Sequence, residues 1–197
     1  SWGYLVYGKI VYSDGSLGSR YQISDYTYDG WRKDKISLAF DGANYLVVYP
    51  DSTSSGMVKI IGVFVSTDGS PGNTFTIAIA NSAKGPAISY GDTSYFVTWK
   101  DQRNGNRDIY GTRVRTDGTV LDPSGIPIFS TSNAEITPSL AFDGENWLVV
   151  CKNLTINRIE AVFVAQNGNA GTSFPVIEGS NPCLCFGLND YFMSSDH

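Results

Sequence analysis

One loop, residues 101–108 (DQRNGNRD), holds two Asp and two Asn side chains around a glycine. Oxygen ligands spaced in this way could wrap Ca²⁺. The downstream acid that an EF-hand loop requires is missing, and two arginines lie in the loop. We therefore expect Arg103 to pair with Asp101 or Asp108 and to rigidify the loop, with bound Ca²⁺ as the alternative. The residues Asp101, Arg103 and Asp108 are counted as ligand-binding candidates.

Catalytic patterns are otherwise scarce. The only histidine is the terminal His197, so no Ser-His or Cys-His relay can be assembled. The sequence contains no HExxH, no G-x-S-x-G and no phosphate-binding glycine loop. Most carboxylates lie in turns, where Asp usually bonds its own backbone: Asp14, Asp41, Asp68, Asp117 and Asp143. Glycosidases need paired acids, and the expected inner-strand positions hold none. The sequence therefore predicts no catalytic residue, no metal site and no enzyme.

Aromatic residues outside the expected strands are the second set of binding candidates. Tyr26, Tyr28 and Trp31 lie in a long connector, residues 25–34, and Trp2 opens the chain. Such rings stack on sugars or anchor protein partners. We expect them to bind a protein or glycan partner, with capping of the neighbouring sheet as the alternative. Asn153 begins an Asn-Leu-Thr sequon for N-glycosylation.

The elements that must position these residues follow from a repeat. Residues 86–130 contain four short apolar runs separated by turn residues, which is typical of a four-stranded antiparallel meander. One landmark, a turn followed by an aromatic, recurs as AFDGANYLVV, SYGDTSYFVT, AFDGENWLVV and CFGLNDYFMS. A second landmark, an Asp-Gly or Asn-Gly turn, recurs at residues 14, 68, 117 and 167.

The spacing of the landmarks predicts a ring. The offsets from first to second landmark are 27 (41 to 68), 26 (91 to 117) and 24 (143 to 167) residues. Joining the two termini gives 10 residues from Gly187 to His197 plus 14 to Asp14, again 24. We therefore expect an all-β fold, one domain over residues 1–197: a four-bladed β-propeller of four-stranded antiparallel blades. The expected blades are residues 36–80, 86–130 and 138–177, with a split blade of residues 182–197 and 1–24 closing the ring. A piece of a longer propeller is the alternative.

The repeated motif also resembles a family. The pattern P-x-x-x-aromatic-D-G-x-N-aromatic-L-V-V, followed by I-Y-G-x-x-V-x-x-D-G, resembles β-propeller repeats of secreted bacterial and archaeal proteins. That resemblance implies the fold and a secreted location, but no defined activity. The four-bladed hemopexin-like domain is similar in size only, because its Asp-Ala-Ala strand motif is absent.

Small residues flank the central apolar residue of each expected inner strand. They are Ser37, Ala39, Ala87, Ser89, Ser139, Ala141, Cys183 and Cys185. In a ring of four blades they would crowd the axis, which explains their size without a ligand; an ion or water held in the channel is the alternative. The three cysteines are expected to be small buried hydrophobes, with a bond between Cys151 and Cys183 or Cys185 as the alternative.

Composition narrows the class of partner. The net charge of −5 argues against nucleic acid, and no apolar run is long enough to span a membrane. With 17% charged residues and 21 glycines, the chain is turn-rich and weakly charged. We therefore expect a non-catalytic extracellular or cell-surface recognition or structural module that binds protein or glycan. The alternatives are a self-assembling surface or filament subunit and a fragment of a larger propeller hydrolase or lyase.

Overall fold

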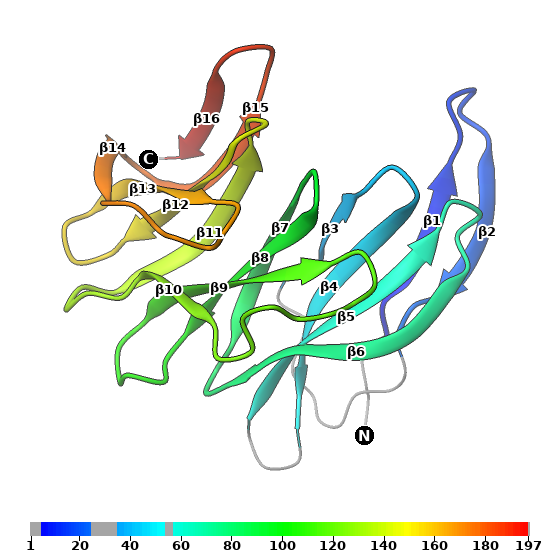
Figure 1. Ribbon diagram of the computed structural model, residues 1–197, viewed down its shortest axis with the longest axis horizontal. Helices are drawn as coiled ribbons and strands as arrows, with labels where there is room; N and C mark the ends of the chain where they lie inside the picture. Colours follow the sequence, from blue (N-terminus) through cyan, green and yellow to red (C-terminus); the bar gives the residue numbers. More distant parts are fainter. Residues whose placement is uncertain (1–4, 25–34, 54–56, 197) are drawn as a thin grey trace.

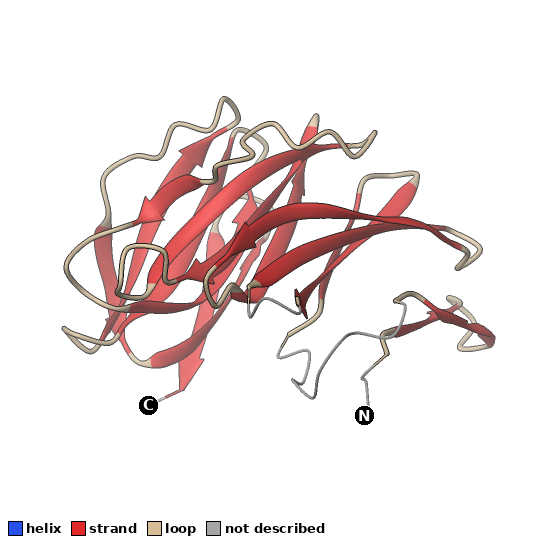
Figure 2. Cartoon of the chain, turned by 90° about the horizontal axis from the view of Figure 1, so that it is seen from below, coloured by secondary structure: helices blue, strands red, loops and turns tan. Residues whose placement is uncertain are grey.

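The computed structural model describes residues 5–24, 35–53 and 57–196, and this part of the chain forms sixteen strands and no helix (Figures 1 and 2). Three four-stranded antiparallel sheets follow one another, each in plain sequence order. Sheet I comprises β3 (Ser37–Phe40), β4 (Asn44–Ser52), β5 (Val58–Ser66) and β6 (Pro71–Ala80). Sheet II comprises β7 (Lys84–Gly91), β8 (Ser94–Asp101), β9 (Asp108–Arg115) and β10 (Ile126–Phe129). Sheet III comprises β11 (Glu135–Phe142), β12 (Asn146–Asn153), β13 (Arg158–Ala165) and β14 (Phe174–Glu178).

Two separate hairpins flank these sheets. The N-terminal hairpin pairs β1 (Tyr7–Val11) with β2 (Leu17–Gln22). The C-terminal hairpin pairs β15 (Ser180–Phe186) with β16 (Tyr191–Asp196). The expected meanders and their turns are thus confirmed.

The recurring turns have a common chemistry. Asp41 Oδ1 accepts hydrogen bonds from the backbone N–H of Ala43 and Asn44, at 2.8 and 2.7 Å, and Asp143 repeats this in sheet III. At the second landmark Gly69 and Gly118 have φ of +94° and +88°, a conformation that favours glycine. The expected structural role of these turn aspartates is confirmed.

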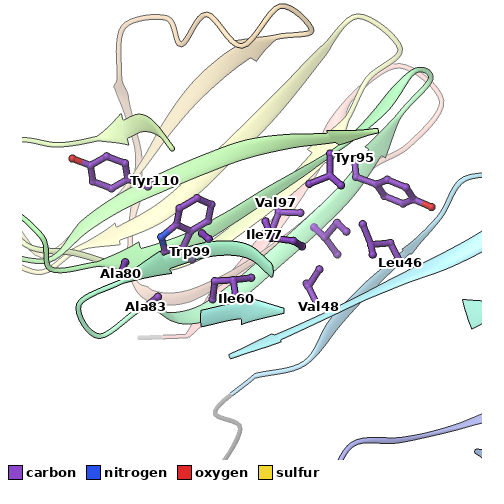
Figure 3. Close-up of a cluster of buried hydrophobic side chains, with 13 residues drawn as sticks. Leu46, Val48, Ile60, Ile77, Ala80, Ala83, Tyr95, Val97, Trp99 and Tyr110 are labelled. Carbon is purple, nitrogen blue, oxygen red and sulfur yellow. The ribbon is translucent and has the colours of Figure 1, made fainter. Parts of the chain in front are cut away.

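Successive sheets pack face to face, and their first strands contact one another in the order β3, β7, β11, β15. Between sheets I and II lies a cluster that includes Leu46, Ile60, Val97 and Trp99 (Figure 3). Two further clusters fill the space between sheets II and III and between sheet III and β15. Tyr95 of sheet II also donates its hydroxyl to Asn44 O of sheet I at 3.2 Å. Burial of these apolar side chains is the main source of the free energy that holds neighbouring sheets together.

The ring expected from the spacing is not closed in the described chain. β1 pairs only with β2, β16 pairs only with β15, and the two hairpins stand at opposite ends of an open arc (Figure 1). The prediction that residues 185–194 and 6–12 are adjacent strands of one sheet is therefore wrong for the single chain. With three complete sheets and two hairpins, the described residues do not establish a count of four blades.

Two small residues of the first strands, Ala87 and Ala141, face a neighbouring sheet. Ala87 lies in the cluster shared with sheet III, and Ala141 lies in the cluster shared with Leu184 of β15. Their small size lets adjacent first strands approach closely. For Ala87 and Ala141, crowding is therefore found between neighbouring sheets.

The cysteines differ from one another. All three are unbonded; Cys151 is buried, whereas Cys183 and Cys185 are exposed. The expectation of three buried cysteines is correct only for Cys151. Cys183 and Cys185 are exposed because they lie on the outer face of the last hairpin, which no further described sheet covers.

Candidate functional site

Buried polar side chains gather at one edge of sheets II and III, which we call the acid edge. β8 ends and β9 begins there with Asp101 paired opposite Asp108. β11 begins and β12 ends there with Glu135 paired opposite Asn153. A backbone hydrogen bond from Glu135 N to Arg107 O, 2.7 Å, joins the two sheets. The antiparallel registers thus bring acids from two sheets to one place.

Asp101 is a structural anchor within this edge. It is fully buried, and its Oδ2 accepts from Arg103 Nη2 at 2.6 Å, Arg103 Nε at 2.9 Å and Trp99 Nε1 at 3.1 Å. The guanidinium of Arg103 also lies over the ring of Tyr110, 4.1 Å from its centre. The expected pairing of Arg103 with an aspartate is confirmed. These bonds occupy the carboxylate and leave it little capacity for an external ligand.

Asp108 is buried but only half satisfied. Its Oδ2 accepts from Asn104 Nδ2 at 2.9 Å and from the hydroxyl of Ser130 at 3.1 Å. Its Oδ1 has no hydrogen-bond partner although it is shielded from solvent. An unpaired buried carboxylate oxygen is costly to the folded state.

Glu135 is the most perturbed acid of the edge. The side chain is 0% exposed, Oε1 accepts from the hydroxyl of Thr131 at 2.8 Å, and Oε2 has no partner. Burial, reinforced by the negative charges of Asp108 and Glu160, raises the pKa of Glu135 to about 7. Near neutral pH this carboxyl can therefore both hold and release a proton.

Glu160 and Asn153 complete the surroundings of Glu135. Glu160 Oε2 accepts from Asn153 Nδ2 at 2.6 Å, and Asn153 Oδ1 accepts from the backbone N–H of Thr155 at 3.1 Å. The pKa of the Cys151 thiol is raised by its burial and by the charges of Glu135 and Glu160. Glu160 therefore adds negative charge to the surroundings of both Glu135 and Cys151.

Asn153 is fully buried, and its amide nitrogen is the atom that would carry a glycan. That nitrogen is bound to Glu160, so a glycosylated Asn153 would have to leave its present position. Glycosylation at Asn153 remains a prediction from the sequon.

Sequence reasoning missed Glu135 and Glu160. The expected strand began at Pro138, whereas β11 begins three residues earlier, at Glu135. The observed inner strand β11 therefore contains an acid, although the inner-strand positions expected from the sequence hold none. The sequence did contain a signal for a strand that starts at Glu135. Polar residues at 135, 137 and 139 alternate with apolar residues at 136 and 140, and Pro138 interrupts this alternation.

The remaining sequence candidates are not brought to this site by any described element. Trp2, Tyr26, Tyr28 and Trp31 lie outside the described residues. Asp101, Arg103 and Asp108 are together at the acid edge, as their positions in one loop require.

Two findings bear on metals and membranes. In residues 5–24, 35–53 and 57–196, no group of three or more His, Cys, Asp or Glu side chains is arranged to hold a metal ion. The same part of the chain contains no helix long and apolar enough to cross a membrane.

No protein-family model and no curated protein matches the sequence. Solved structures do match the arrangement of sheets. The catalytic domain of a GH62 α-L-arabinofuranosidase from Coprinopsis cinerea has a TM-score of 0.50 and 10% identity, over 76% of this chain and 51% of its own. An α-L-arabinofuranosidase from Lactobacillus brevis has a TM-score of 0.54 and 14% identity, over 81% of this chain and 62% of its own.

A subtype N10 neuraminidase-like protein of A/little yellow-shouldered bat/Guatemala/060/2010 also matches, with a TM-score of 0.50 and 10% identity, over 76% of this chain and 47% of its own. The chain thus spans about half to three fifths of the length of these structures. At such low identity the similarity demonstrates a shared fold, and it supports the β-propeller interpretation.

These comparisons correct the expectation of a non-catalytic module. Two of the structures that share the arrangement of sheets are α-L-arabinofuranosidases. One ground for excluding catalysis was the lack of acids in the expected inner strands, and the observed strand β11 does contain an acid, Glu135.

Proposed function

We propose that this chain forms part of a glycoside hydrolase, with Glu135 as the proton donor. The observation that carries the proposal is the buried Glu135 carboxyl with a pKa raised to about 7. A general acid must be protonated at the working pH and must release its proton to the departing oxygen. Among the similar structures, the two arabinofuranosidases cleave glycosidic bonds by name.

The partner group is Asp108, whose Oδ1 is buried and unpaired. Glycosidases use two carboxyls, one that donates a proton and one that acts as base or nucleophile. In this scheme Glu135 protonates the glycosidic oxygen as the bond to the sugar carbon breaks. The carboxylate of Asp108 then takes the second role, and water supplies the new hydroxyl group. Asn104 and Ser130 hold Asp108 in place through Oδ2.

Substrate access is set by the connection from sheet II to sheet III. Glu135 has no exposed surface, and Thr131 in this connection bonds its carboxyl. Asn106 holds the same connection through hydrogen bonds to Thr131 O and Asn133 O, at 2.8 and 2.7 Å. A glycan can reach Glu135 only when this connection moves. The extracellular or cell-surface location expected from composition suits an activity on glycans.

The test compares aryl and alkyl α-L-arabinofuranosides as substrates of the wild type, Glu135→Gln and Asp108→Asn. Glu145→Gln, at an exposed turn position of sheet III, is the matched control. Loss of a general acid costs about 10²- to 10⁴-fold, and the loss is smaller when the leaving group is an activated phenol. We expect Glu135→Gln to lose more activity on the alkyl than on the 4-nitrophenyl glycoside, and Glu145→Gln to match the wild type.

A sialic acid glycoside, tested in parallel, covers the substrate class suggested by the neuraminidase-like structure. Wild-type protein that hydrolyses none of these substrates would contradict the proposal. So would an equal loss on both arabinofuranosides in Glu135→Gln, because that result indicates a structural role.

A further inference from the structure

One equivalent apolar residue in each of the four first strands can be compared for its exposure to solvent. Leu38, Ile88, Leu140 and Leu184 occupy the same position of the repeat. Ile88, Leu140 and Leu184 are 9%, 7% and 8% exposed, because each packs on the sheet that precedes it. Leu38 is 58% exposed. Among the described residues, sheet I is preceded only by the N-terminal hairpin, and no first or second strand lies over Leu38.

The opposite end of the arc shows the complementary defect. Phe192 of β16 is 70% exposed, whereas its repeat equivalents Leu46, Phe96 and Leu148 are 0%, 0% and 7% exposed. Each equivalent is covered by the sheet that follows it. No described sheet follows the C-terminal hairpin. Two apolar faces are thus exposed. The face around Phe192 lacks a sheet that follows it, and the face around Leu38 lacks the first and second strands of a sheet that precedes it.

The two hairpins are also complementary halves of one sheet. In the sequence repeat, β15 and β16 of the C-terminal hairpin correspond to the first and second strands of a complete sheet. β1 and β2 of the N-terminal hairpin correspond to the third and fourth strands. Every complete sheet pairs its second strand with its third, as in β4 with β5, β8 with β9 and β12 with β13. β16 and β1 are the strands that lack this partner among the described residues.

We propose that a second copy of this chain binds head to tail, so that β16 of one copy pairs with β1 of the next. In that contact Leu38 of the second copy packs against Phe192 and Cys185 of the first. The same contact at both ends gives a closed pair with three complete sheets from each copy and two composite sheets. Head-to-tail contacts of this kind form rings when the rotation closes. This inference does not rest on the proposed hydrolysis.

A groove beside β1 is the receiving surface. It has a volume of ≈ 460 Å³ and lies between β1 and sheet I, lined by apolar residues that include Val11, Ile36, Leu38 and Tyr45. Val11 is 67% exposed, against 6%, 0% and 0% for its equivalents Val65, Val114 and Val164. Strands that pair with β1 on this side would bury Val11 and Leu38 together. Exposed apolar surface of this kind marks an interaction site.

The repeat also predicts the register of the contact. The complete sheets pair Val48 with Gly62, Thr98 with Gly111 and Val150 with Ala161, which are equivalent positions. Carried over to the two hairpins, this register pairs Ser194 with Gly8 of the second copy. Met193 then lies directly opposite Lys9, on the face turned away from Phe192.

The first experiment measures the mass of the full chain in solution by light scattering after size exclusion. We expect twice the monomer mass of 21.4 kDa. Leu38→Asp and Phe192→Asp should each reduce the mass to that of the monomer, because each places a charge in the contact. Ile79→Asp is the matched control, since Ile79 is 53% exposed on β6, the fourth strand of sheet I, whereas Leu38 lies on the first strand.

Mixing the two monomeric variants distinguishes a head-to-tail contact from other forms of association. A Leu38→Asp copy retains an intact Phe192 face, and a Phe192→Asp copy retains an intact Leu38 face. One unmodified contact is therefore possible in the mixture, and we expect a pair to form. A monomeric wild type would overturn the proposal, as would an assembly that survives both substitutions.

A cross-link tests the register without relying on these variants. In a background with Cys151, Cys183 and Cys185 replaced by serine, Lys9→Cys with Met193→Cys should give a covalent dimer under oxidation. Ile10→Cys with Met193→Cys is the control, because neighbouring strand residues point to opposite faces. Equal cross-linking of both combinations, or of neither, would overturn the predicted pairing.

Discussion

At the scale of single residues, environment decides what the acids of this chain can do. The turn aspartates accept local hydrogen bonds. The Ser66 hydroxyl and the Ser70 backbone N–H hold the pKa of Asp68 below its ordinary value, and the Thr119 backbone N–H does the same for Asp117. The pKa of Glu135 is raised instead, because its carboxyl is buried near two other carboxyls. Its chemistry could not be read from the sequence, where Glu135 is one acid among nineteen Asp and Glu residues.

The raised pKa of Glu135 predicts a stability that depends on pH. In the unfolded chain this carboxyl ionises near its ordinary pKa of 4.5, whereas in the folded chain it ionises near 7. The folded state is therefore penalised progressively as the pH rises from about 4.5 to about 7, and the penalty is constant above that. Because Gln does not ionise, we expect Glu135→Gln to avoid this penalty, which amounts to about 1–3 kcal/mol in the free energy of unfolding above pH ~7.

The measurement is urea unfolding of the wild type and Glu135→Gln at pH 4.5 and pH 8. Glu145→Gln serves as the exposed control. The free energy of unfolding of Glu135→Gln, relative to that of the wild type, should be higher at pH 8 than at pH 4.5. A difference that does not change with pH would show that Glu135 titrates normally.

Asp101 should contribute stability instead of activity. Removing its carboxylate leaves Trp99 Nε1 buried without a partner and deprives Arg103 of its ion pair. We expect Asp101→Ala to lower the free energy of unfolding by about 2–4 kcal/mol, since both losses occur at a buried position. Asp117→Ala, at an exposed turn, should cost far less. Equal unfolding midpoints for the two variants would refute the role assigned to Asp101.

At the scale of elements, strand positions could be predicted because turn residues and apolar runs repeat along the chain. The runs at 109–115 and 126–129 are strands with nearly the same bounds, β9 and β10. The start of β11 was missed because Pro138 interrupts its apolar alternation. The structure accommodates Pro138 at an irregular point of the ladder, where the register shifts between Ile136 and Ser139.

The close approach of first strands can be tested at Ala141. Its side chain is 8% exposed and packs with Leu148, Val150 and Leu184. We expect Ala141→Leu to destabilise the protein by about 1–3 kcal/mol through overpacking. Ala39→Leu should cost less, because Ala39 is only half-buried. Chemical denaturation of both variants checks the order, and a larger loss for Ala39→Leu would contradict the packing described here.

At the scale of the whole molecule, ring closure could not be predicted from spacing. The sum of 24 residues shows that the terminal segments, if joined, would match the spacing of the two landmarks within one unit. It contains no information on the rotation between successive sheets, which determines whether the ends meet. Three sheets and two hairpins leave an open arc, in which Leu38 and Phe192 are exposed at opposite ends. The acid edge likewise depends on how sheet II meets sheet III, a contact between residues distant in the sequence.

The most direct test of the proposed hydrolysis is the pH dependence of kcat/KM for an alkyl α-L-arabinofuranoside. Because the proton donor must be protonated, we predict that activity falls above pH ~7 by about tenfold per pH unit. In Glu135→Gln this alkaline limb should disappear, while Glu145→Gln should retain it. A limb that persists unchanged in Glu135→Gln, or a wild-type profile without a limb near pH 7, would contradict the assignment of Glu135 as the catalytic acid.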